Sequence, residues 1–233
     1  MNPKIARLFN AIKKSKATLV VSPHHTGTWF ALEFLLWHSR FCKVVELNDA
    51  LWGNHPLHSS CIIHLHLAGN GINSRGVIKG ISIDDVAQLV RFVPTLIPIR
   101  DPMSAIISRQ ERHPGFDHTL IVDAFTHLWK FNPSAWLPVD LLGSYHDRLN
   151  LLSDTLQRLG LNVEPYIYRY ARDWTPQNTR GDYELKHIYA NGDLEGLRNR
   201  MPVNFDYLIM RRHEIAPFMA KRGYPHFSWE DYR

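Results

Sequence analysis

Residues 17–29 read ATLVVSPHHTGTW, and this stretch decides the fold class. Its first part, Ala17 to Ser22, is a continuous apolar run with β-branched residues, a pattern typical of a strand buried on both faces. A turn around Gly27 follows, and the apolar segment from Trp29 to Arg40 has the length of a buried helix. A buried strand that runs directly into a buried helix is the first half of a βαβ unit, so we expect a parallel sheet.

Strands and helices alternate through the rest of the chain. Further strands are predicted at Cys42–Leu47, Cys61–Leu67, Thr95–Ile99 and Glu164–Tyr170. Helices are predicted from Asp101 with Pro102 in the first turn, and at Ile83–Phe92, Val122–Phe131, Asp140–Leu159 and Phe205–Arg222. This alternation predicts an α/β fold, a three-layer sandwich with a central, mostly parallel sheet, in a single domain over residues 1–233. In such sheets ligands bind at the carboxyl ends of the strands.

Composition restricts the classes of function. With 45% apolar and 21% charged residues, the 233-residue chain has the composition of a soluble globular protein. The formal charge of +5 suits an anionic ligand, but no Lys/Arg run of the kind found in nucleic-acid-binding proteins is present. No apolar run long enough for a signal peptide core or a membrane span follows the basic N-terminal segment, so we expect a cytoplasmic protein without a membrane span.

The chain has only two cysteines, Cys42 and Cys61. Two thiols cannot form a disulfide framework, and no CxxC spacing suggests zinc. Because free cysteine is among the most buried residue types, both are predicted to be buried thiols in adjacent strands.

The turn between the first strand and the first long helix has the features of an anion site. Gly27 lets backbone N–H groups face a common point, and the helix N-terminus adds a partial positive charge. Thr26 and Thr28 add hydroxyl donors for phosphate oxygens. The turn lacks the GxxxxGK[ST] pattern, so an ordinary strand–helix turn with Thr26 as N-cap remains the alternative.

Two further segments carry candidate site residues. Arg100 ends a predicted strand, and Ser108 lies eight positions later, about two helical turns on. His64 and His66 alternate along another strand, so their side chains share one face. An imidazole titrates near neutrality and can act as general base for an attacking hydroxyl or amine. Taken singly, each segment also fits a structural reading, with a surface arginine, a solvent-facing serine and two packed histidines.

In this order the three segments resemble the signature set of the sulfotransferases that use 3′-phosphoadenosine 5′-phosphosulfate (PAPS). The stretch from His25 to Trp29 resembles the family's KTGTT loop, with histidine in place of lysine. His64-Leu-His66 occupies the slot of the family's KTH motif, and Arg100-Asp-Pro with Ser108 matches its RNPxxxxxS motif. The matches cover residues 17–108 and, more loosely, 163–173, where YRYARD resembles the family's RYEDL segment.

This resemblance implies a P-loop NTPase-like sulfotransferase fold and a set of roles. The 5′-phosphosulfate would contact Thr26, Gly27, Thr28 and Trp29. The 3′-phosphate would be held by Arg100 and Ser108, and His66 would deprotonate the acceptor. His25 and His64 stand at the positions of the family's lysines, and bound anions would favour their charged forms. PAPS would be the co-substrate, no metal is required, and the acceptor is a hydroxyl or amine of a small molecule, glycan or peptide. Trp52 is a candidate to stack on adenine, and Arg180, Arg198 and Arg200 either complete the 3′-phosphate site or are solvated surface charges.

Three alternatives stay open at this point. The two lysine-to-histidine differences also suit a protein of the same fold that binds a nucleotide but has lost transfer. A metal-dependent hydrolase would use His24, His25, His64 and His66 as ligands, although no acidic ligand stands at HxHxD spacing. A P-loop kinase that uses ATP is disfavoured by the missing loop lysine, since phosphoryl transfer relies on that charge and on Mg²⁺.

Overall fold

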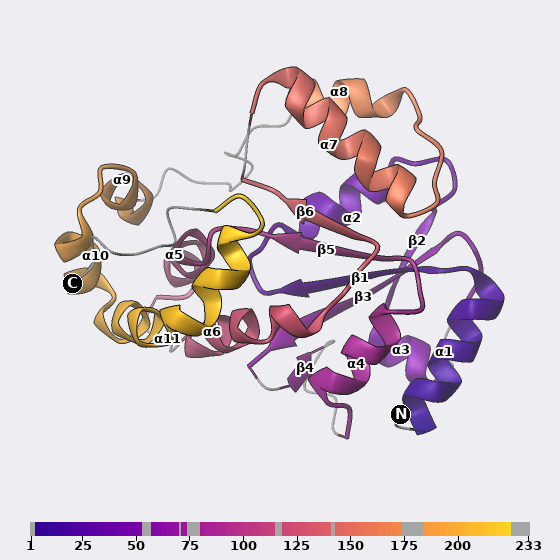
Figure 1. Cartoon of the computed structure of the whole chain (residues 1–233), viewed down its shortest axis with the longest axis horizontal. Coiled ribbons are helices and arrows are strands. Elements are labelled where there is room, and N and C mark those ends of the chain that lie inside the picture. Colours follow the sequence, from indigo (N-terminus) through magenta and orange to yellow (C-terminus); the bar gives the residue numbers. More distant parts are fainter. Residues whose placement is uncertain are drawn as a thin grey trace.

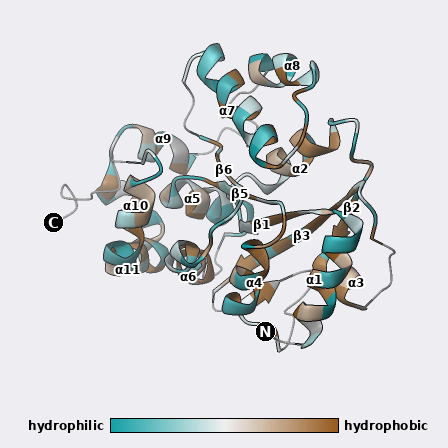
Figure 2. Ribbon diagram, turned by 45° about the vertical axis from the view of Figure 1, so that its right-hand side comes forward, coloured by the Kyte–Doolittle hydropathy of each residue, from teal (hydrophilic) through white to brown (hydrophobic). Residues whose placement is uncertain are grey.

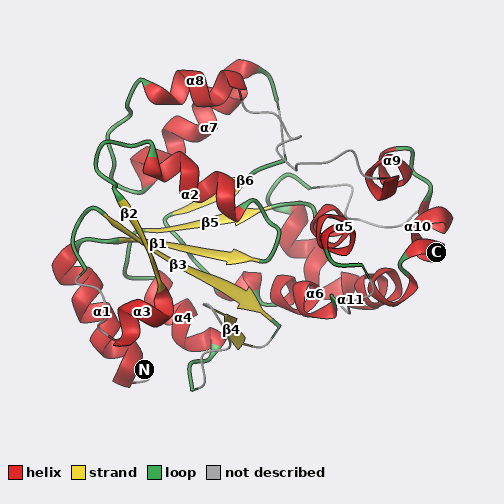
Figure 3. Ribbon diagram, turned by 180° about the vertical axis from the view of Figure 1, so that it is seen from behind, coloured by secondary structure: helices red, strands yellow, loops and turns green. Residues whose placement is uncertain are grey.

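The computed structural model describes residues 3–52, 57–69, 71–73, 80–114, 118–140, 143–173 and 184–224. Its centre is one sheet with the strand order β2-β3-β1-β5-β6, all parallel, and β4 pairs antiparallel with β3 (Figures 1 and 3). The strands are β1 (Thr18–Pro23), β2 (Lys43–Glu46), β3 (Cys61–Ala68), β4 (Gly71–Asn73), β5 (Thr95–Ile99) and β6 (Ala135–Pro138). The predicted α/β sandwich with a central parallel sheet is confirmed.

Helices cover both faces of the sheet, which gives three layers (Figure 1). One face carries α2 (Thr28–Leu36), α7 (Tyr145–Arg158) and α8 (Tyr166–Asp173). The other carries α1 (Pro3–Ser15), α3 (Leu47–Trp52), α4 (Ile83–Val90), α5 (Pro102–Arg112), α6 (Thr119–Thr126) and α11 (Pro202–Ala220). The short elements η1 (Leu128–Lys130), α9 (Glu184–Ala190) and α10 (Leu194–Arg200) complete the described chain. None of the described helices combines the length and apolarity needed to cross a bilayer.

Strand alternation divides the interior into two apolar clusters. Val20 of β1 and Ile62 of β3 pack on the α2 side, whereas Leu19 and Ile63 pack on the opposite side. All six residues of β1 are buried, so this strand is the centre of the molecule, and Figure 2 shows the strands around it as its most hydrophobic part. The continuous apolar run in the sequence is therefore explained by burial on both faces.

The chain leaves β1 and β3 on opposite faces of the sheet. After β1 it enters α2 on one face, and after β3 and β4 it enters α4 on the other face and then reaches β5. The two strands are neighbours, paired from Thr18 opposite Ile62 to Pro23 opposite Leu67. In open parallel sheets, ligands bind at the carboxyl ends of two neighbouring strands whose connections leave on opposite faces. We therefore expect the site at the carboxyl ends of β1 and β3.

Several predicted elements match the structure closely. The strands at 42–47, 61–67 and 95–99 correspond to β2, β3 and β5. The predicted helix from Asp101 is α5, where the Ser104 N–H donates to Asp101 Oδ2 at 2.7 Å and Pro102 is the first helical residue.

The predicted strand at Glu164–Tyr170 is wrong, because this segment forms α8. Its β-branched and aromatic residues suggested a strand, but Ile167 and Ala171, four positions apart, are the residues that α8 buries. The fifth parallel strand is the four-residue β6, which the sequence analysis missed because two prolines, Pro133 and Pro138, bracket a short run.

Two smaller predictions also need correction. Cys61 is buried as expected, but Cys42 is exposed because it precedes β2 instead of lying within it. The predicted helix at 140–159 begins later, at Tyr145, since Ser144 is its N-cap and forms a reciprocal capping box with Asp147.

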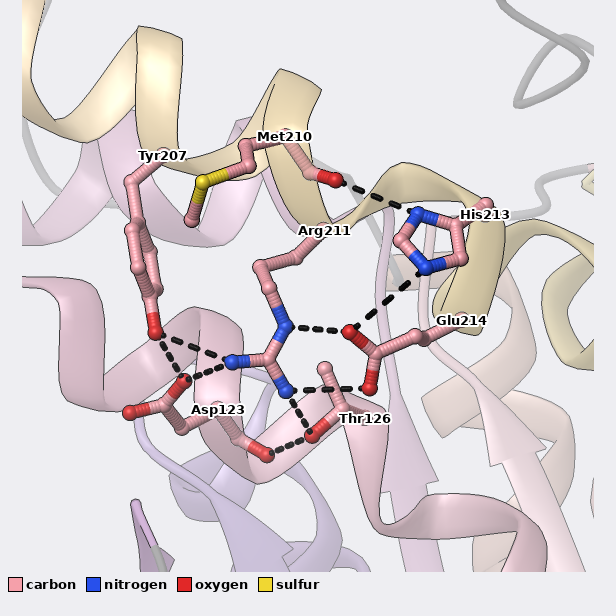
Figure 4. Close-up of polar contacts among 7 residues, drawn as sticks. All are labelled: Asp123, Thr126, Tyr207, Met210, Arg211, His213 and Glu214. Atoms are coloured by element: carbon pink, nitrogen blue, oxygen red, sulfur yellow. Dashed lines mark hydrogen bonds and ion pairs between the residues drawn. The ribbon is translucent and has the colours of Figure 1, made fainter.

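A polar cluster joins α11 to α6 (Figure 4). Its centre is Arg211, whose guanidinium donates to Asp123, Thr126 and Glu214, with distances of 3.3 Å to Asp123 Oδ1 and 3.0 Å to Glu214 Oε2. The Tyr207 hydroxyl donates to the same Asp123 carboxylate at 2.6 Å. These contacts hold α11 against α6, and α6 in turn packs on the sheet.

Candidate functional site

The loop that follows β1 has an unusual backbone conformation at two residues. His25 has φ 61° and Gly27 has φ 88°, so both lie in the left-handed region. A Cβ atom at Gly27 would lie 2.7 Å from Val139 Cγ2, which makes glycine necessary there on two grounds. For His25 the conformation costs about 1–2 kcal/mol, and other contacts of this residue must offset that strain.

Hydroxyl groups close the loop from within. Thr26 Oγ1 donates to the Pro23 carbonyl at 2.8 Å, and Thr28 Oγ1 donates to Ser22 Oγ at 2.8 Å. Both hydroxyl hydrogens that the sequence analysis assigned to phosphate are thus engaged inside the protein. Gly27 is the N-cap of α2 and gives it no side-chain cap, so the donors that this helix end offers to an anion are backbone N–H groups. Trp29, next along the helix, is 80% exposed.

The two histidines of β3 share one face of the strand, as predicted, and each has a partner on a neighbouring strand. Ser22 lies opposite His66 in the sheet, with 3.2 Å between Ser22 Oγ and His66 Nδ1. Glu46 lies opposite His64, with 3.2 Å between Glu46 Oε1 and His64 Nδ1. The Nε2 atom of His64 is buried and has no hydrogen-bond partner among the described residues. An unsatisfied buried nitrogen costs about 1–3 kcal/mol, which a polar ligand atom would recover.

A third imidazole, that of His24, lies flat on His66. Their ring centroids are 4.1 Å apart and the ring planes differ by 16°. Burial, followed by the charges of Arg109 and His64, lowers the pKa of His24 to about 4. Burial, followed by the neighbouring imidazoles, lowers the pKa of His66 to about 2. Both rings are therefore neutral at pH 7, and a bound anion would shift their pKa values upward.

The loop contacts α5 through His25. His25 Nδ1 lies 3.4 Å from Ser108 Oγ, and His25 Nε2 lies 3.5 Å from Nη1 of Arg109. Burial and the charges of Arg109 and Arg112 lower the pKa of His25 to about 3, so the ring is neutral at pH 7 in the unliganded protein. Arg109 is not among the site residues predicted from the sequence, although it directly follows Ser108, the last residue of a predicted motif.

Arg100 lies in a separate polar cluster at the ends of β5 and β6. Its side chain is 13% exposed, and Nε lies 3.8 Å from Asp140 Oδ2. The Asp101 N–H donates to the same Oδ2 at 2.9 Å, and the Tyr224 hydroxyl donates to Asp140 Oδ1. Burial and the nearby Asp140 raise the pKa of Asp101 to about 6, and burial also raises the pKa of Asp140. In the described contacts, Arg100 and Ser108 are not joined directly.

The histidines do not form a metal site in the part of the chain that the structure describes. No group of three or more His, Cys, Asp or Glu side chains there has the arrangement needed to hold a metal ion. The stacking of His24 on His66 explains part of this result, because ring nitrogen lone pairs lie in the ring planes and two parallel stacked rings do not direct them to one point.

The remaining candidates lie away from this edge or outside the described residues. Arg198 and Arg200 are exposed and form ion pairs with Asp206 and Glu184, as solvated surface charges do. The side chain of Trp52 and all of Arg180 lie outside the described residues.

No protein-family model matches the chain, and neither a curated protein nor a solved structure matches it. The functional inference therefore rests on the arrangement of the site residues.

Proposed function

We propose that this protein is a sulfotransferase that moves the sulfo group of PAPS to a hydroxyl or amine acceptor, on a P-loop NTPase-like fold. The proposal rests on one observation. Of the three segments that resemble the sulfotransferase motifs, the first lies within hydrogen-bonding range of each of the other two, through residues that are 44 and 83 positions apart in the chain. Ser22 of the first segment contacts His66 of the second, and His25 of the first contacts Ser108 of the third.

The fold supports this assignment. The loop with Gly27 lies between the central strand and α2, at the edge where parallel sheets bind ligands. The uncapped N-terminus of α2 offers backbone N–H groups and a partial positive charge to the 5′-phosphosulfate. Trp29, in the first turn of α2, is exposed and would be accessible to the donor.

The 3′-phosphate would bind Arg100 and Ser108. The ion pair of Arg100 with Asp140 is loose at 3.8 Å, so guanidinium N–H donors remain for phosphate oxygens. A phosphate bound beside the buried imidazoles would raise their lowered pKa values, because a nearby negative charge favours the charged form of the ring.

In the proposed reaction, His66 acts as the general base. The acceptor oxygen or nitrogen attacks sulfur and forms a bond to it, while the proton of the acceptor atom passes to His66. The bond between sulfur and the bridging oxygen breaks, and its electron pair leaves with adenosine 3′,5′-bisphosphate. No metal ion takes part in this scheme.

Calorimetric titration of adenosine 3′,5′-bisphosphate tests the donor site, with AMP and ATP as competitors that lack the 3′-phosphate. We expect micromolar binding to the wild type, and binding about tenfold or more weaker in Arg100→Ala. Arg91→Ala is the matched control, because Arg91 is exposed and lies before β5, at the opposite edge of the sheet. Equal binding of AMP and ATP, or no binding at all, would exclude the sulfotransferase assignment.

A protein of the same fold that binds the nucleotide without transfer is the second candidate. It is favoured by the low pKa of His66, since such an imidazole accepts a proton poorly until an anion binds nearby. An acceptor screen with ³⁵S-labelled PAPS separates the two candidates. Labelled product that disappears in His66→Ala supports transfer, and tight nucleotide binding with no product from any acceptor class supports binding alone.

A further inference from the structure

The family's loop lysine has no charged substitute within the loop itself. His25 stands at that position, and it is neutral at pH 7 because burial and two nearby guanidinium groups lower its pKa to about 3. His64, at the second lysine position, contacts Glu46, whose carboxylate would offset any positive charge on the ring. If PAPS binds here, the positive charge next to its sulfo group must come from another element.

Arg109 on α5 is close enough to supply that charge. Its Nη1 atom lies 3.5 Å from His25 Nε2, so the guanidinium borders the loop. Arg109 is half-buried, whereas Arg112, one turn later on the same helix, is exposed. Within the described residues, no carboxylate pairs with either arginine. This differs from Arg100, which has Asp140 as its counter-ion.

The hydrogen-bond roles around His25 follow from the chemistry of the guanidinium. A guanidinium group has donors only, so Nε2 of His25 must be the acceptor of this contact. The imidazole hydrogen then resides on Nδ1, which faces Ser108 Oγ at 3.4 Å. Ser108 accepts at its oxygen, and its own hydroxyl hydrogen is left for a further acceptor. Arg109 thus orients His25 and, through it, Ser108.

Arg109 lies close enough to Arg112 to be repelled by its charge, and no carboxylate of the described residues offsets this repulsion, which a bound anion would relieve. Partial burial and repulsion by Arg112 lower the pKa of Arg109 in the unliganded protein. Two oxygens of a sulfo group can each accept a hydrogen bond from the planar fork of a guanidinium. A lysine ammonium does not offer this two-point geometry.

We propose that Arg109 binds the transferred sulfo group of the donor and so replaces the loop lysine of similar enzymes. This inference rests on the proposed function and assigns to α5 a residue that the sequence motifs do not include. It predicts that the loop after β1 supplies backbone N–H donors to the site, while the positive charge comes from the guanidinium of Arg109 on α5.

The test compares two ligands that differ only in the sulfo group. Calorimetry measures the binding of PAPS and of adenosine 3′,5′-bisphosphate to the wild type, Arg109→Ala and Arg109→Lys. We expect Arg109→Ala to bind PAPS about tenfold or more weakly, and to lose clearly less affinity for the bisphosphate, which it reaches only indirectly through His25 and Ser108. Arg109→Lys restores part of the PAPS affinity, because it keeps the charge but loses the two-point contact. Arg112→Ala, with its exposed side chain, is the control for a general loss of positive charge.

A second readout does not depend on the donor. In Arg109→Ala, NMR titration of the His25 ring should show a higher pKa than in the wild type, since a nearby positive charge is removed. Circular dichroism and thermal melting establish that the variant is folded.

The outcomes separate the two levels of the proposal. Wild type that binds neither nucleotide overturns the sulfotransferase assignment and this inference together. Wild type that binds both, with Arg109→Ala unchanged or weakened equally for both ligands, overturns the role of Arg109 alone.

Discussion

Ser22 Oγ lies 3.2 Å from Nδ1 of His66, on the strand next to it, and the same oxygen accepts a hydrogen bond from Thr28. For His66 to act as a base through Nε2, its hydrogen must reside on Nδ1 and point at Ser22. The serine is then a positioning residue that selects the tautomer of His66, and it links the base to the first turn of α2.

Ser22→Ala should therefore reduce transfer without affecting donor binding. We expect kcat to fall about tenfold, in line with the lower end of general-base effects, while the affinity for adenosine 3′,5′-bisphosphate stays within about twofold. Steady-state kinetics and calorimetry measure the two quantities. Ser153→Ala is the control, since that hydroxyl donates to its own helix at Leu149. A parallel loss of nucleotide binding in Ser22→Ala would assign the serine to loop structure instead.

The strained backbone of His25 can be tested with a pair of substitutions. Alanine and glycine both remove the contacts with Ser108 and Arg109, but only glycine tolerates φ 61° without strain. We expect His25→Gly to have a free energy of unfolding about 1 kcal/mol higher than His25→Ala, measured by urea denaturation. Equal stabilities would mean that the left-handed conformation of residue 25 is not kept once its side chain is gone.

Gly27→Ala should be among the most destabilising single substitutions in the loop. The new methyl group would clash with Val139 at 2.7 Å and would also occupy a backbone conformation with φ 88°. We expect a loss of about 2 kcal/mol or more in the free energy of unfolding. In the double variant Gly27→Ala with Val139→Ala, the clash is relieved and only the strain remains. A double variant no more stable than the sum of the two single changes would argue against contact between these residues.

Asp101 predicts a specific dependence of stability on pH. Its pKa is raised to about 6 in the folded protein, by burial and by Asp140, against about 3.8 unfolded. The folded protein therefore holds the proton more tightly, so this contribution is present below about pH 4 and is lost as the pH rises through 6. Arg100, Tyr189 and Tyr224 are the other charged or titratable groups facing this pair.

Asp101→Asn keeps an N-cap acceptor for the Ser104 N–H and cannot ionise. Its free energy of unfolding relative to wild type should rise between pH 4 and pH 6.5, by up to roughly 3 kcal/mol for a two-unit pKa difference. Chemical denaturation at several pH values measures this difference. Exposed carboxyls with lowered pKa values, such as Asp147 and Glu214, have the opposite effect on stability. Because this effect is the same in wild type and variant, it cancels when the two free energies of unfolding are subtracted. A constant difference across this range would contradict the raised pKa of Asp101.

The cluster around Arg211 should stabilise the protein independently of the site. Arg211→Met keeps much of the apolar stem but removes the donors to Asp123, Thr126 and Glu214. We expect a loss of about 1–3 kcal/mol in the free energy of unfolding, with nucleotide binding unchanged. His213→Ala is the control, because that side chain is 75% exposed. If both variants melt at the wild-type temperature, the contacts in Figure 4 are not energetically important.

Sequence patterns predicted the strands that are buried on both faces and the edge strand β2, and they failed for β6 and α8. β1 and β3 are long, largely apolar runs of a kind that surface elements lack. The sequence therefore identified both as strands and located them. β6 has only four residues, of which the last is Pro138, and α8 is rich in tyrosine, so local propensity pointed the wrong way for both. Tertiary packing against α7 and α2 decides the conformation of α8, and a single sequence does not display it.

The candidate site was predictable in its members but not in its contacts. Strand alternation was enough to place His64 and His66 on one face. It did not indicate that Asp140 pairs with Arg100, or that His25 bridges to Arg109, because these contacts join residues 40 and 84 positions apart. Spacing identifies residues on one element, whereas contacts between elements depend on register and crossing geometry.

Tyr224 gives the fold a dependence on the order of synthesis. Its hydroxyl reaches the Ile99 carbonyl and the Asp140 carboxylate, 125 and 84 residues earlier in the chain. As the polypeptide leaves the ribosome, the central strands can pair once β6 has emerged, but Asp140 must wait for residue 224 to gain this partner. In a nascent chain, Asp140 therefore lacks its hydrogen bond from Tyr224 until 84 further residues have been translated. Burial of the cluster around Arg100 is completed only after that point.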